Sequence, residues 1–142
     1  MANSSGKPDA EDFTASLLMT VYHGSNPDWL EVALDSIVNQ TRLADEYVIV
    51  YDGPVSITIV KLVEQYLGNN DEINLNVIQL PKNEGLCKAL SIGVQACSQN
   101  FIIRMDDDDV SLPDRFDALA KAFAETPNFD VIGTQICEFE EN

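Results

Sequence analysis

Residues 16–38, SLLMTVYHGSNPDWLEVALDSIV, have the pattern of a strand, a turn and a helix in succession. The apolar run 16–22 has the length and composition of a buried strand. Asn26 and Pro27 follow it as a helix cap and a first-turn proline. Apolar side chains then recur at the spacing of one helix face, at Leu30, Ala33, Leu34, Ile37 and Val38. The stretch therefore predicts a buried strand followed by an amphipathic helix.

The same alternation continues along the chain. Further apolar runs predict strands over 47–51, 73–80, 101–105 and 131–139, and helical periodicity predicts helices over 59–67, 86–97 and 116–123. Ser111 to Asp114 has the pattern of a capping box with proline in the first helical turn. Because strands that alternate with helices are joined by right-handed crossovers, we predict an α/β, Rossmann-like fold with a mainly parallel sheet and helices on both faces. Residues 1–14 lack periodicity and are predicted to be a flexible leader to a domain over 15–142.

The composition limits the partners of this domain. The 142 residues include 24 acidic and 8 basic side chains, which gives a net charge of −16, and 45% of them are hydrophobic. The hydrophobic fraction is sufficient for a compact core, whereas the negative charge disfavours nucleic acid and anionic lipid surfaces as partners. No apolar stretch is long enough to form a membrane segment. The three cysteines form no C-x-x-C pair, so the sequence indicates neither a zinc site nor a disulfide framework.

Polar or flexible residues follow each of the first four predicted strands. Tyr22, Asp52, Asn83, Gly85 and Asp106 stand in these turns. In open parallel sheets, ligands bind at the carboxyl ends of the strands. We therefore predict that these five residues meet in one ligand-binding crevice. Solvated turns without function have a similar composition and are the alternative interpretation.

Four aspartates, Asp106 to Asp109, directly follow the predicted strand 101–105. Adjacent carboxylates raise one another's pKa and repel, so a counter-ion is expected beside them. Asp106 and Asp108 stand at alternate positions, which suits one hard cation such as Mg²⁺ or Mn²⁺ whose remaining positions are taken by water and phosphate. A solvated turn, or a cap for the following helix, is the alternative. The chain has neither G-x-G-x-x-G after its first strand nor G-x-x-x-x-G-K-[ST], which argues against dinucleotide oxidoreductases and P-loop enzymes.

Three segments resemble motifs of family 2 glycosyltransferases with the GT-A fold. Residues 104–116, RMDDDDVSLPDRF, are similar to the R-M-D-x-D-D-x-x-L-P-x-R-[FL] segment of bacterial exopolysaccharide and capsule enzymes of the amylovoran-synthesis type. Residues 29–41, WLEVALDSIVNQT, resemble the first helix of the family with its S-[IV]-x-x-Q-T ending. Residues 83–93, NEGLCKALSIG, resemble its N-x-G-L-x-x-A-L-N-x-G turn and helix. The resemblance extends from about Ala15 to the last residue.

The resemblance implies an enzyme that transfers a sugar, with inversion, from a nucleotide-diphosphate sugar to a saccharide or lipid-linked acceptor. Asp106 and Asp108 would be the acids of a D-x-D motif, with Asp108 a direct ligand of Mn²⁺ or Mg²⁺ and Asp106 nearer the ribose. Such an ion bridges the diphosphate and stabilises the departing nucleotide. Asp52 would contact the base, and Tyr22 would line the nucleotide pocket together with the turn at 83–85.

The chain departs from the family pattern close to this expected pocket. Thr20 and His23 stand where a proline and an asparagine usually flank the tyrosine, and Tyr51 replaces the acid that usually precedes Asp52. The base and sugar preferences of relatives therefore do not transfer to this chain.

The family places its catalytic base beyond the matched region, so we assign that role to no residue here and expect the base after Asn142. We predict that residues 15–142 are the nucleotide-sugar-binding half of a truncated GT-A domain. We expect a cytoplasmic protein whose full-length form lies at the inner face of the membrane. A nucleotidyltransferase-like enzyme and a non-catalytic acidic interaction domain are the alternative hypotheses.

Overall fold

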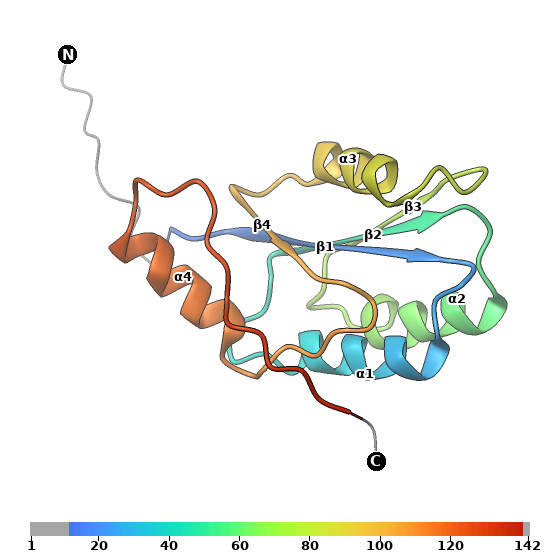
Figure 1. The fold of residues 1–142 in the computed structure, drawn as a ribbon, viewed down its shortest axis with the longest axis horizontal. Coiled ribbons are helices and arrows are strands. Elements are labelled where there is room, and N and C mark those ends of the chain that lie inside the picture. Colours follow the sequence, from blue (N-terminus) through green and yellow to red (C-terminus); the bar gives the residue numbers. More distant parts are fainter. Residues whose placement is uncertain (1–11, 141–142) are drawn as a thin grey trace.

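The computed structural model describes residues 12–140 (Figure 1). The chain forms β1 (Ala15–Tyr22), α1 (Pro27–Val38), β2 (Glu46–Asp52), α2 (Ile57–Val63), β3 (Leu75–Gln79), α3 (Leu86–Ala96), β4 (Phe101–Arg104) and α4 (Arg115–Glu125). A π-helical segment, Glu64–Gly68, extends α2. The predicted alternation is therefore confirmed from β1 to α4. No helix within residues 12–140 is long and apolar enough to cross a lipid bilayer.

The four strands form one parallel sheet in the order β3-β2-β1-β4. The register pairs Tyr22 of β1 with Asp52 of β2, and Leu18 of β1 with Arg104 of β4. Because all strands run in the same direction, their carboxyl ends lie at one edge of the sheet, and the turns that follow them gather there. The predicted parallel sheet is confirmed.

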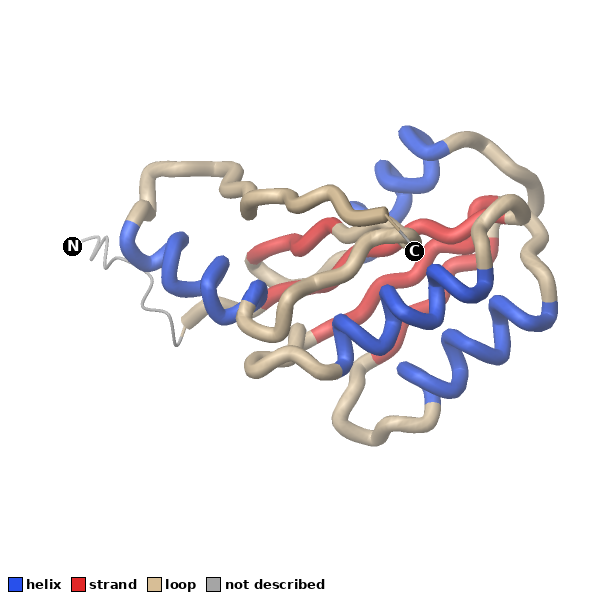
Figure 2. Tube along the Cα trace, turned by 60° about the horizontal axis from the view of Figure 1, so that its bottom comes forward, coloured by secondary structure: helices blue, strands red, loops and turns tan. Residues whose placement is uncertain are grey.

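Helices cover both faces of the sheet (Figures 1 and 2). Successive strand residues point to opposite faces, so Leu17 and Leu18 of β1 belong to different cores. Leu17 contributes to the larger core, which β1 and β2 share with α1, α2 and α4. Leu18 contributes to the smaller core, where Ala89 of α3 packs with Val48 and Val50. The prediction of helices on both faces is thus confirmed.

The packed chain begins before Ala15. Phe13, which falls within the predicted leader, is only 4% exposed, and its ring stacks on Phe101 with 4.6 Å between centroids. Phe13 also stacks on Phe123 of α4, so it joins the start of β4 to that helix. Residues 1–11 of the predicted leader lie outside the described residues.

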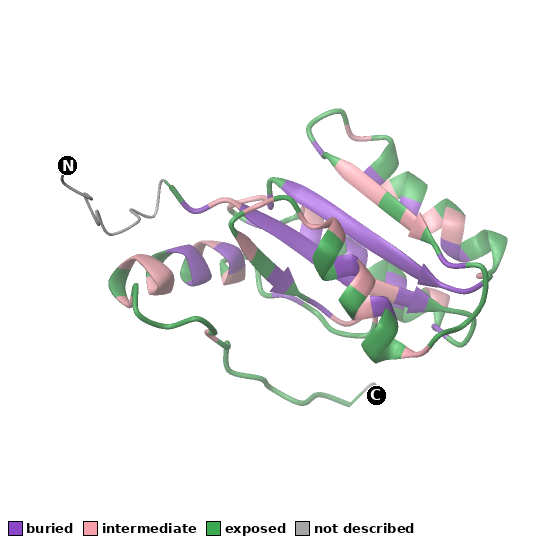
Figure 3. Cartoon of the chain, turned by 90° about the horizontal axis from the view of Figure 1, so that it is seen from above, coloured by how far each residue is buried: buried purple, intermediate pink, exposed green. Residues whose placement is uncertain are grey.

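The strand predicted over 131–139 is wrong for this structure, in which the segment is irregular. Its apolar side chains lie in solvent, with Val131 84% and Ile136 87% exposed, and Figure 3 shows the segment as exposed along nearly all its length. A strand requires a neighbour that satisfies its backbone hydrogen bonds. Within the described part of the chain β4 pairs only with β1, and no strand pairs with 131–139.

The predicted capping box at 111–114 is also wrong. α4 begins at Arg115, and the side chain of Asp114 makes no capping hydrogen bond. The two residues before Asp114 are held elsewhere: the carbonyl of Leu112 accepts from the side chain of Gln40 at 2.8 Å, and the carbonyl of Pro113 accepts from the backbone N–H of Thr41 at 2.8 Å. Contact with the end of α1 therefore keeps this segment out of the helix.

Candidate functional site

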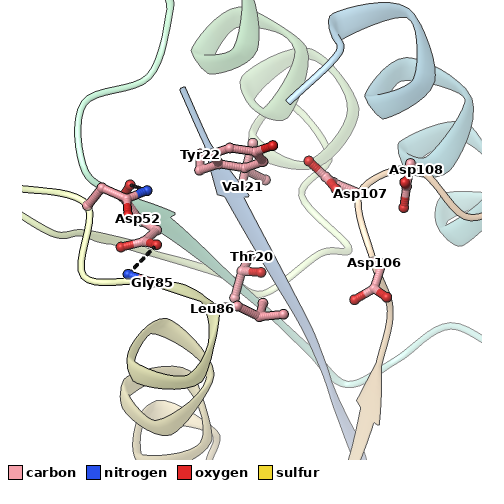
Figure 4. Close-up of a pocket in the computed structure, with 10 residues that line it drawn as sticks. Thr20, Val21, Tyr22, Asp52, Gly85, Leu86, Asp106, Asp107 and Asp108 are labelled. Carbon is pink, nitrogen blue, oxygen red and sulfur yellow. Dashed lines mark hydrogen bonds between the residues drawn. The ribbon is translucent and has the colours of Figure 1, made fainter. Parts of the chain in front are cut away.

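A pocket of about 400 Å³ opens at the carboxyl ends of the strands (Figure 4). It is lined by Thr20, Val21, Tyr22, Asp52, Asn83, Gly85, Leu86, Asp106, Asp107 and Asp108. This lining includes all six residues that the sequence predicted for substrate or metal binding. Asp52 and the aspartates at 106–108 lie on opposite sides of β1, with Tyr22 between them (Figure 4). The structure thus brings these turns together at one pocket, and their role in binding a ligand stays a prediction.

Asp52 organises the wall of the pocket formed by the β3–α3 turn. The residue is 4% exposed, and its two carboxylate oxygens accept the backbone N–H groups of Glu84 at 2.7 Å and Gly85 at 3.0 Å. The turn after β2 lies very close to the turn before α3: a Cβ on Gly53 would lie 2.5 Å from the backbone nitrogen of Asn83. Glycine is therefore required at position 53, where φ is +88°. The base contact expected of Asp52 stays a prediction, and its observed role is to hold this turn.

Tyr51, which stands where the family has an acid, does not line the pocket. It is 5% exposed and packs in the larger core of the sheet. Burial, followed by the charge of Glu64, raises the pKa of Tyr51 to about 12, so its hydroxyl is neutral at physiological pH. The departure at this position therefore replaces an acid with a core side chain.

Tyr22 lies at the mouth of the pocket and is 44% exposed. Ser25 closes the turn that carries it, since the Ser25 N–H donates to the Tyr22 carbonyl at 3.1 Å and the Ser25 hydroxyl accepts the Tyr22 N–H at 3.0 Å. The ring of His23 meets the tyrosine ring edge-on, with 5.3 Å between centroids. The turn thus presents an aromatic ring beside the aspartates (Figure 4).

The opposite side of the pocket is formed by the acid loop, which we define as Asp106 to Asp109. Burial, followed by the charges of Asp108 and Asp106, raises the pKa of Asp107, although a hydrogen bond with Ser25 opposes this. Burial and the same two charges also raise the pKa of Asp109. Mutual repulsion of these carboxylates, predicted from the sequence, is therefore present. Arg104 partly offsets it by an ion pair with Asp106, with 2.9 Å between Nη2 and Oδ1.

Three residues at the end of α1 anchor the segment after the acid loop, a role that the sequence alone did not predict. Gln40 is 7% exposed, and its amide donates to the Leu112 carbonyl and accepts the Phe116 N–H at 3.1 Å. The hydroxyl of Ser36 accepts the Ser111 N–H at 3.1 Å. The backbone N–H of Thr41 donates to the Pro113 carbonyl at 2.8 Å. Polar side chains that are buried need hydrogen-bond partners. The polar side chains of Ser36 and Gln40, at the end of a helix that packs on the core, were the feature of the sequence that could have indicated these contacts.

The described part of the chain does not form a closed metal cage by itself. Among residues 12–140, no group of three or more His, Cys, Asp and Glu side chains is arranged to hold a metal ion. Asp106 and Asp108 nevertheless line the same pocket and offer hard oxygen donors. This donor set fits Mg²⁺ or Mn²⁺ held by one or two carboxylates, with the other positions filled by ligand phosphates and water.

The family of the chain follows from its sequence matches. Residues 16–142 match the family model for glycosyl transferase family 2. This chain belongs to glycosyl transferase family 2. The amylovoran biosynthesis glycosyltransferase AmsE of Erwinia amylovora is 37% identical over 127 residues, which cover 89% of this chain and 47% of AmsE. The resemblance indicated by the three sequence motifs is confirmed.

A second relative in the family is the Escherichia coli UDP-Gal:alpha-D-GlcNAc-diphosphoundecaprenol beta-1,3-galactosyltransferase. It is 30% identical over 127 residues, which cover 89% of this chain and 45% of that enzyme. This family 2 chain therefore spans about half the length of the curated relatives it matches.

Solved structures of glycosyltransferases share the fold of this family 2 chain. S. aureus TarS 1–349 in complex with UDP superposes with a TM-score of 0.68 and 22% identity, over 80% of this chain and 32% of the other. The mannosyltransferase PcManGT of Pyrobaculum calidifontis, in complex with GDP-Man and Mn²⁺, gives a TM-score of 0.65 and 21% identity, over 82% of this chain and 33% of the other. The predicted Rossmann-like GT-A fold is confirmed.

Proposed function

We propose that residues 15–142 are the nucleotide-sugar-binding half of an inverting glycosyltransferase that acts in surface polysaccharide synthesis. The observation that carries this proposal is the pocket in which the acid loop faces Tyr22 and Asp52 in a chain of family 2. Its volume of about 400 Å³ lies within the range typical of small-molecule sites. The amylovoran enzyme among the relatives supports a role in polysaccharide synthesis.

We propose that Asp106 and Asp108 hold Mn²⁺ or Mg²⁺ against the donor diphosphate. When bound, the ion neutralises the diphosphate and stabilises the departing nucleotide as a Lewis acid. The negative charge of the acid loop supports this assignment, because a dianionic donor would otherwise be repelled from it. PcManGT, which has the same fold, was solved with both GDP-Man and Mn²⁺.

In this proposal the chain's own residues bind and orient the nucleotide. Tyr22 offers an exposed ring to the base, and Asp106 lies nearer the ribose. Asn83 and Gly85 border the nucleotide on the wall that Asp52 holds through two backbone hydrogen bonds. Asp52 contacts the base through the lone pairs that those bonds leave free.

We propose that the acceptor-binding residues and the catalytic base lie outside residues 15–142. The matched region covers less than half of each of these two relatives, which supports this division. We propose a saccharide or lipid-linked acceptor, because one relative is named for transfer to a diphosphoundecaprenol-linked sugar. A lipid-linked acceptor would place the full-length enzyme at the cytoplasmic face of the membrane.

Isothermal titration with UDP, GDP, CDP and dTDP, each with Mn²⁺ and with EDTA, tests the proposal. We expect one of these nucleotides to bind only when Mn²⁺ is present, and Asp108→Ala to weaken that binding by about tenfold or more. Asp109→Ala is the matched control, because it removes the same charge from a side chain outside the pocket lining. Equal binding by wild type and Asp108→Ala, or no binding of any nucleotide, would contradict the proposal and favour the acidic interaction domain.

A further inference from the structure

Arg115, the first residue of α4, joins the two ends of the acid loop. Its Nη2 donates to the carbonyl of Arg104, directly before the loop region, at 3.1 Å. Its Nη1 donates to the hydroxyl of Ser111, after the loop, at 3.0 Å. The Ser111 side chain is buried, and its hydroxyl in turn donates to Sδ of Met105 at 3.1 Å. One half-buried guanidinium therefore spans the chain from residue 104 to residue 111.

The backbone of the acid loop makes few hydrogen bonds within its own length. At its start, Met105 N–H donates to the Leu18 carbonyl at 3.1 Å, and the Ser36 hydroxyl holds Ser111 at its end. Between these anchors the backbone makes one long hydrogen bond, from Asp109 N–H to the Asp106 carbonyl at 3.4 Å. Apart from the hydrogen bond between Asp107 and Ser25 and the ion pair between Arg104 and Asp106, the relative placement of the carboxylates therefore depends on how the loop ends are joined.

Arg115 also contributes charge to this region. Its guanidinium interacts electrostatically with Asp109, which lies outside the pocket lining. This cation offsets part of the repulsion within the acid loop. The planar fork of arginine can donate to two acceptors at once, which a lysine ammonium on a flexible stem does less well.

We propose that Arg115 is a positioning residue that sets the geometry of Asp106 and Asp108 for a divalent cation. This inference rests on the proposed metal role of those two aspartates. It predicts a change opposite in sign to that expected from charge alone. Removing a cation beside four aspartates should by itself tighten Mn²⁺ binding, whereas loss of loop closure should weaken it.

The test measures binding of Mn²⁺ alone, from the electron paramagnetic resonance signal of the free ion. We expect Arg115→Met to weaken Mn²⁺ binding by about fivefold to tenfold and Arg115→Lys to have an intermediate effect. Lys121→Met is the matched control, because Lys121 lies on the same helix and pairs with Asp117 at 2.6 Å, away from the loop. Unchanged or tighter binding by Arg115→Met, with circular dichroism matching wild type, overturns the proposal.

Ser111→Ala separates geometry from charge, since it removes one acceptor of Arg115 and keeps the guanidinium. We expect it to weaken Mn²⁺ binding in the same direction, and the double variant with Arg115→Met to bind no more weakly than Arg115→Met alone. Additive effects of the two substitutions would show that the residues act independently and would contradict the proposed closure.

Backbone hydrogen exchange without metal makes this inference testable apart from the proposed function. We expect Arg115→Met to increase the exchange rates of the hydrogen-bonded amides of Met105, Asp109 and Ser111, and Lys121→Met to leave them unchanged. If wild type binds no Mn²⁺, either alone or with a nucleoside diphosphate, the proposed function fails, and so does the metal part of this inference. Exchange rates that are equal in Arg115→Met and wild type overturn the loop closure itself, whatever the metal result.

Discussion

Carboxylates at the two ends of the parallel sheet have pKa values shifted in opposite directions. At the amino end, Oε2 of the buried Glu46 accepts the Ser16 hydroxyl at 2.6 Å and the Ser98 N–H at 2.9 Å. Burial raises the pKa of Glu46, but these hydrogen bonds outweigh it and bring the pKa below its usual value of 4.5. At the carboxyl end, burial and neighbouring aspartates raise the pKa values of Asp107 and Asp109.

This difference separates an acid whose charge is compensated within the fold from the acids of the loop, which we propose bind a metal ion. Glu46 joins β1, β2 and the turn before β4, and its charge is compensated by donors. The acid loop concentrates four carboxylates at a pocket, and their repulsion is only partly offset by Arg104 and Arg115. Asp52 lies at the carboxyl end but resembles Glu46, because both of its oxygens have donors.

Among these carboxylates, Asp52→Ala should have the largest effect on stability. The substitution removes the carboxylate that accepts two hydrogen bonds, from the N–H groups of Glu84 and Gly85, and a hydrogen bond to a charged group contributes about 1.5–3 kcal/mol. We expect the free energy of unfolding, measured in urea, to fall by about 2–4 kcal/mol. Asp52→Asn keeps one accepting oxygen and should recover part of this loss. A decrease below about 1 kcal/mol would show that the turn does not depend on Asp52.

Glu46→Gln should destabilise the protein at neutral pH by about 1–2 kcal/mol, because it removes charge-assisted hydrogen bonds. The pKa of Glu46 is lowered in the folded state, so its stabilisation is present above about pH 4.5 and is lost as the pH falls through the folded pKa. The difference in unfolding free energy between wild type and Glu46→Gln should therefore narrow in acid. A difference that does not change from pH 7 to pH 3 would contradict this assignment.

Asp107→Asn is the matching change at the carboxyl end, and its expected effect is smaller and opposite in sign. The folded-state pKa of Asp107 is raised, so its contribution to stability is full below about pH 3.8 and is lost as the pH rises through the folded pKa. Without metal, we expect the thermal midpoint of Asp107→Asn to exceed that of wild type slightly at pH 7, and the gap to close in acid. If Asp107→Asn is less stable than wild type at pH 7, as expected for Glu46→Gln, the proposed difference between the two ends of the sheet is contradicted.

Arg104→Met should have the smallest effect on folding. Arg104 and the Asp106 side chain are 52% and 47% exposed, and ion pairs between exposed groups contribute less than about 1 kcal/mol. We expect the unfolding free energy to change by at most this amount, and Mn²⁺ to bind at least as tightly as in wild type because Asp106 loses a competing cation. Weaker Mn²⁺ binding would assign Arg104 a positioning role like that proposed for Arg115.

The sequence predicted what depends on local pattern. Apolar periodicity indicated the strands and helices, and parallel topology then brought Tyr22, Asp52 and Asp106 to one edge. Contacts between distant segments were not predictable in this way. The bond between Gln40 and Leu112 joins residues 72 positions apart, and it keeps the residues before Arg115 out of α4. Residues 131–139 have strand-like composition, but no strand pairs with them within residues 12–140.

Amide spectra recorded during titration with Mn²⁺ and the cognate nucleoside diphosphate test the central claim most directly. Paramagnetic Mn²⁺ broadens the signals of nearby amides, so the broadening at each end of the sheet shows whether the ion binds there. The proposed site predicts selective broadening at Asp106 to Asp108, then at Tyr22, with sharp signals at Ser16 and Glu46. Broadening that is absent from the acid loop, or spread equally over the exposed carboxylates of the whole chain, would contradict a metal-dependent nucleotide site at the carboxyl end.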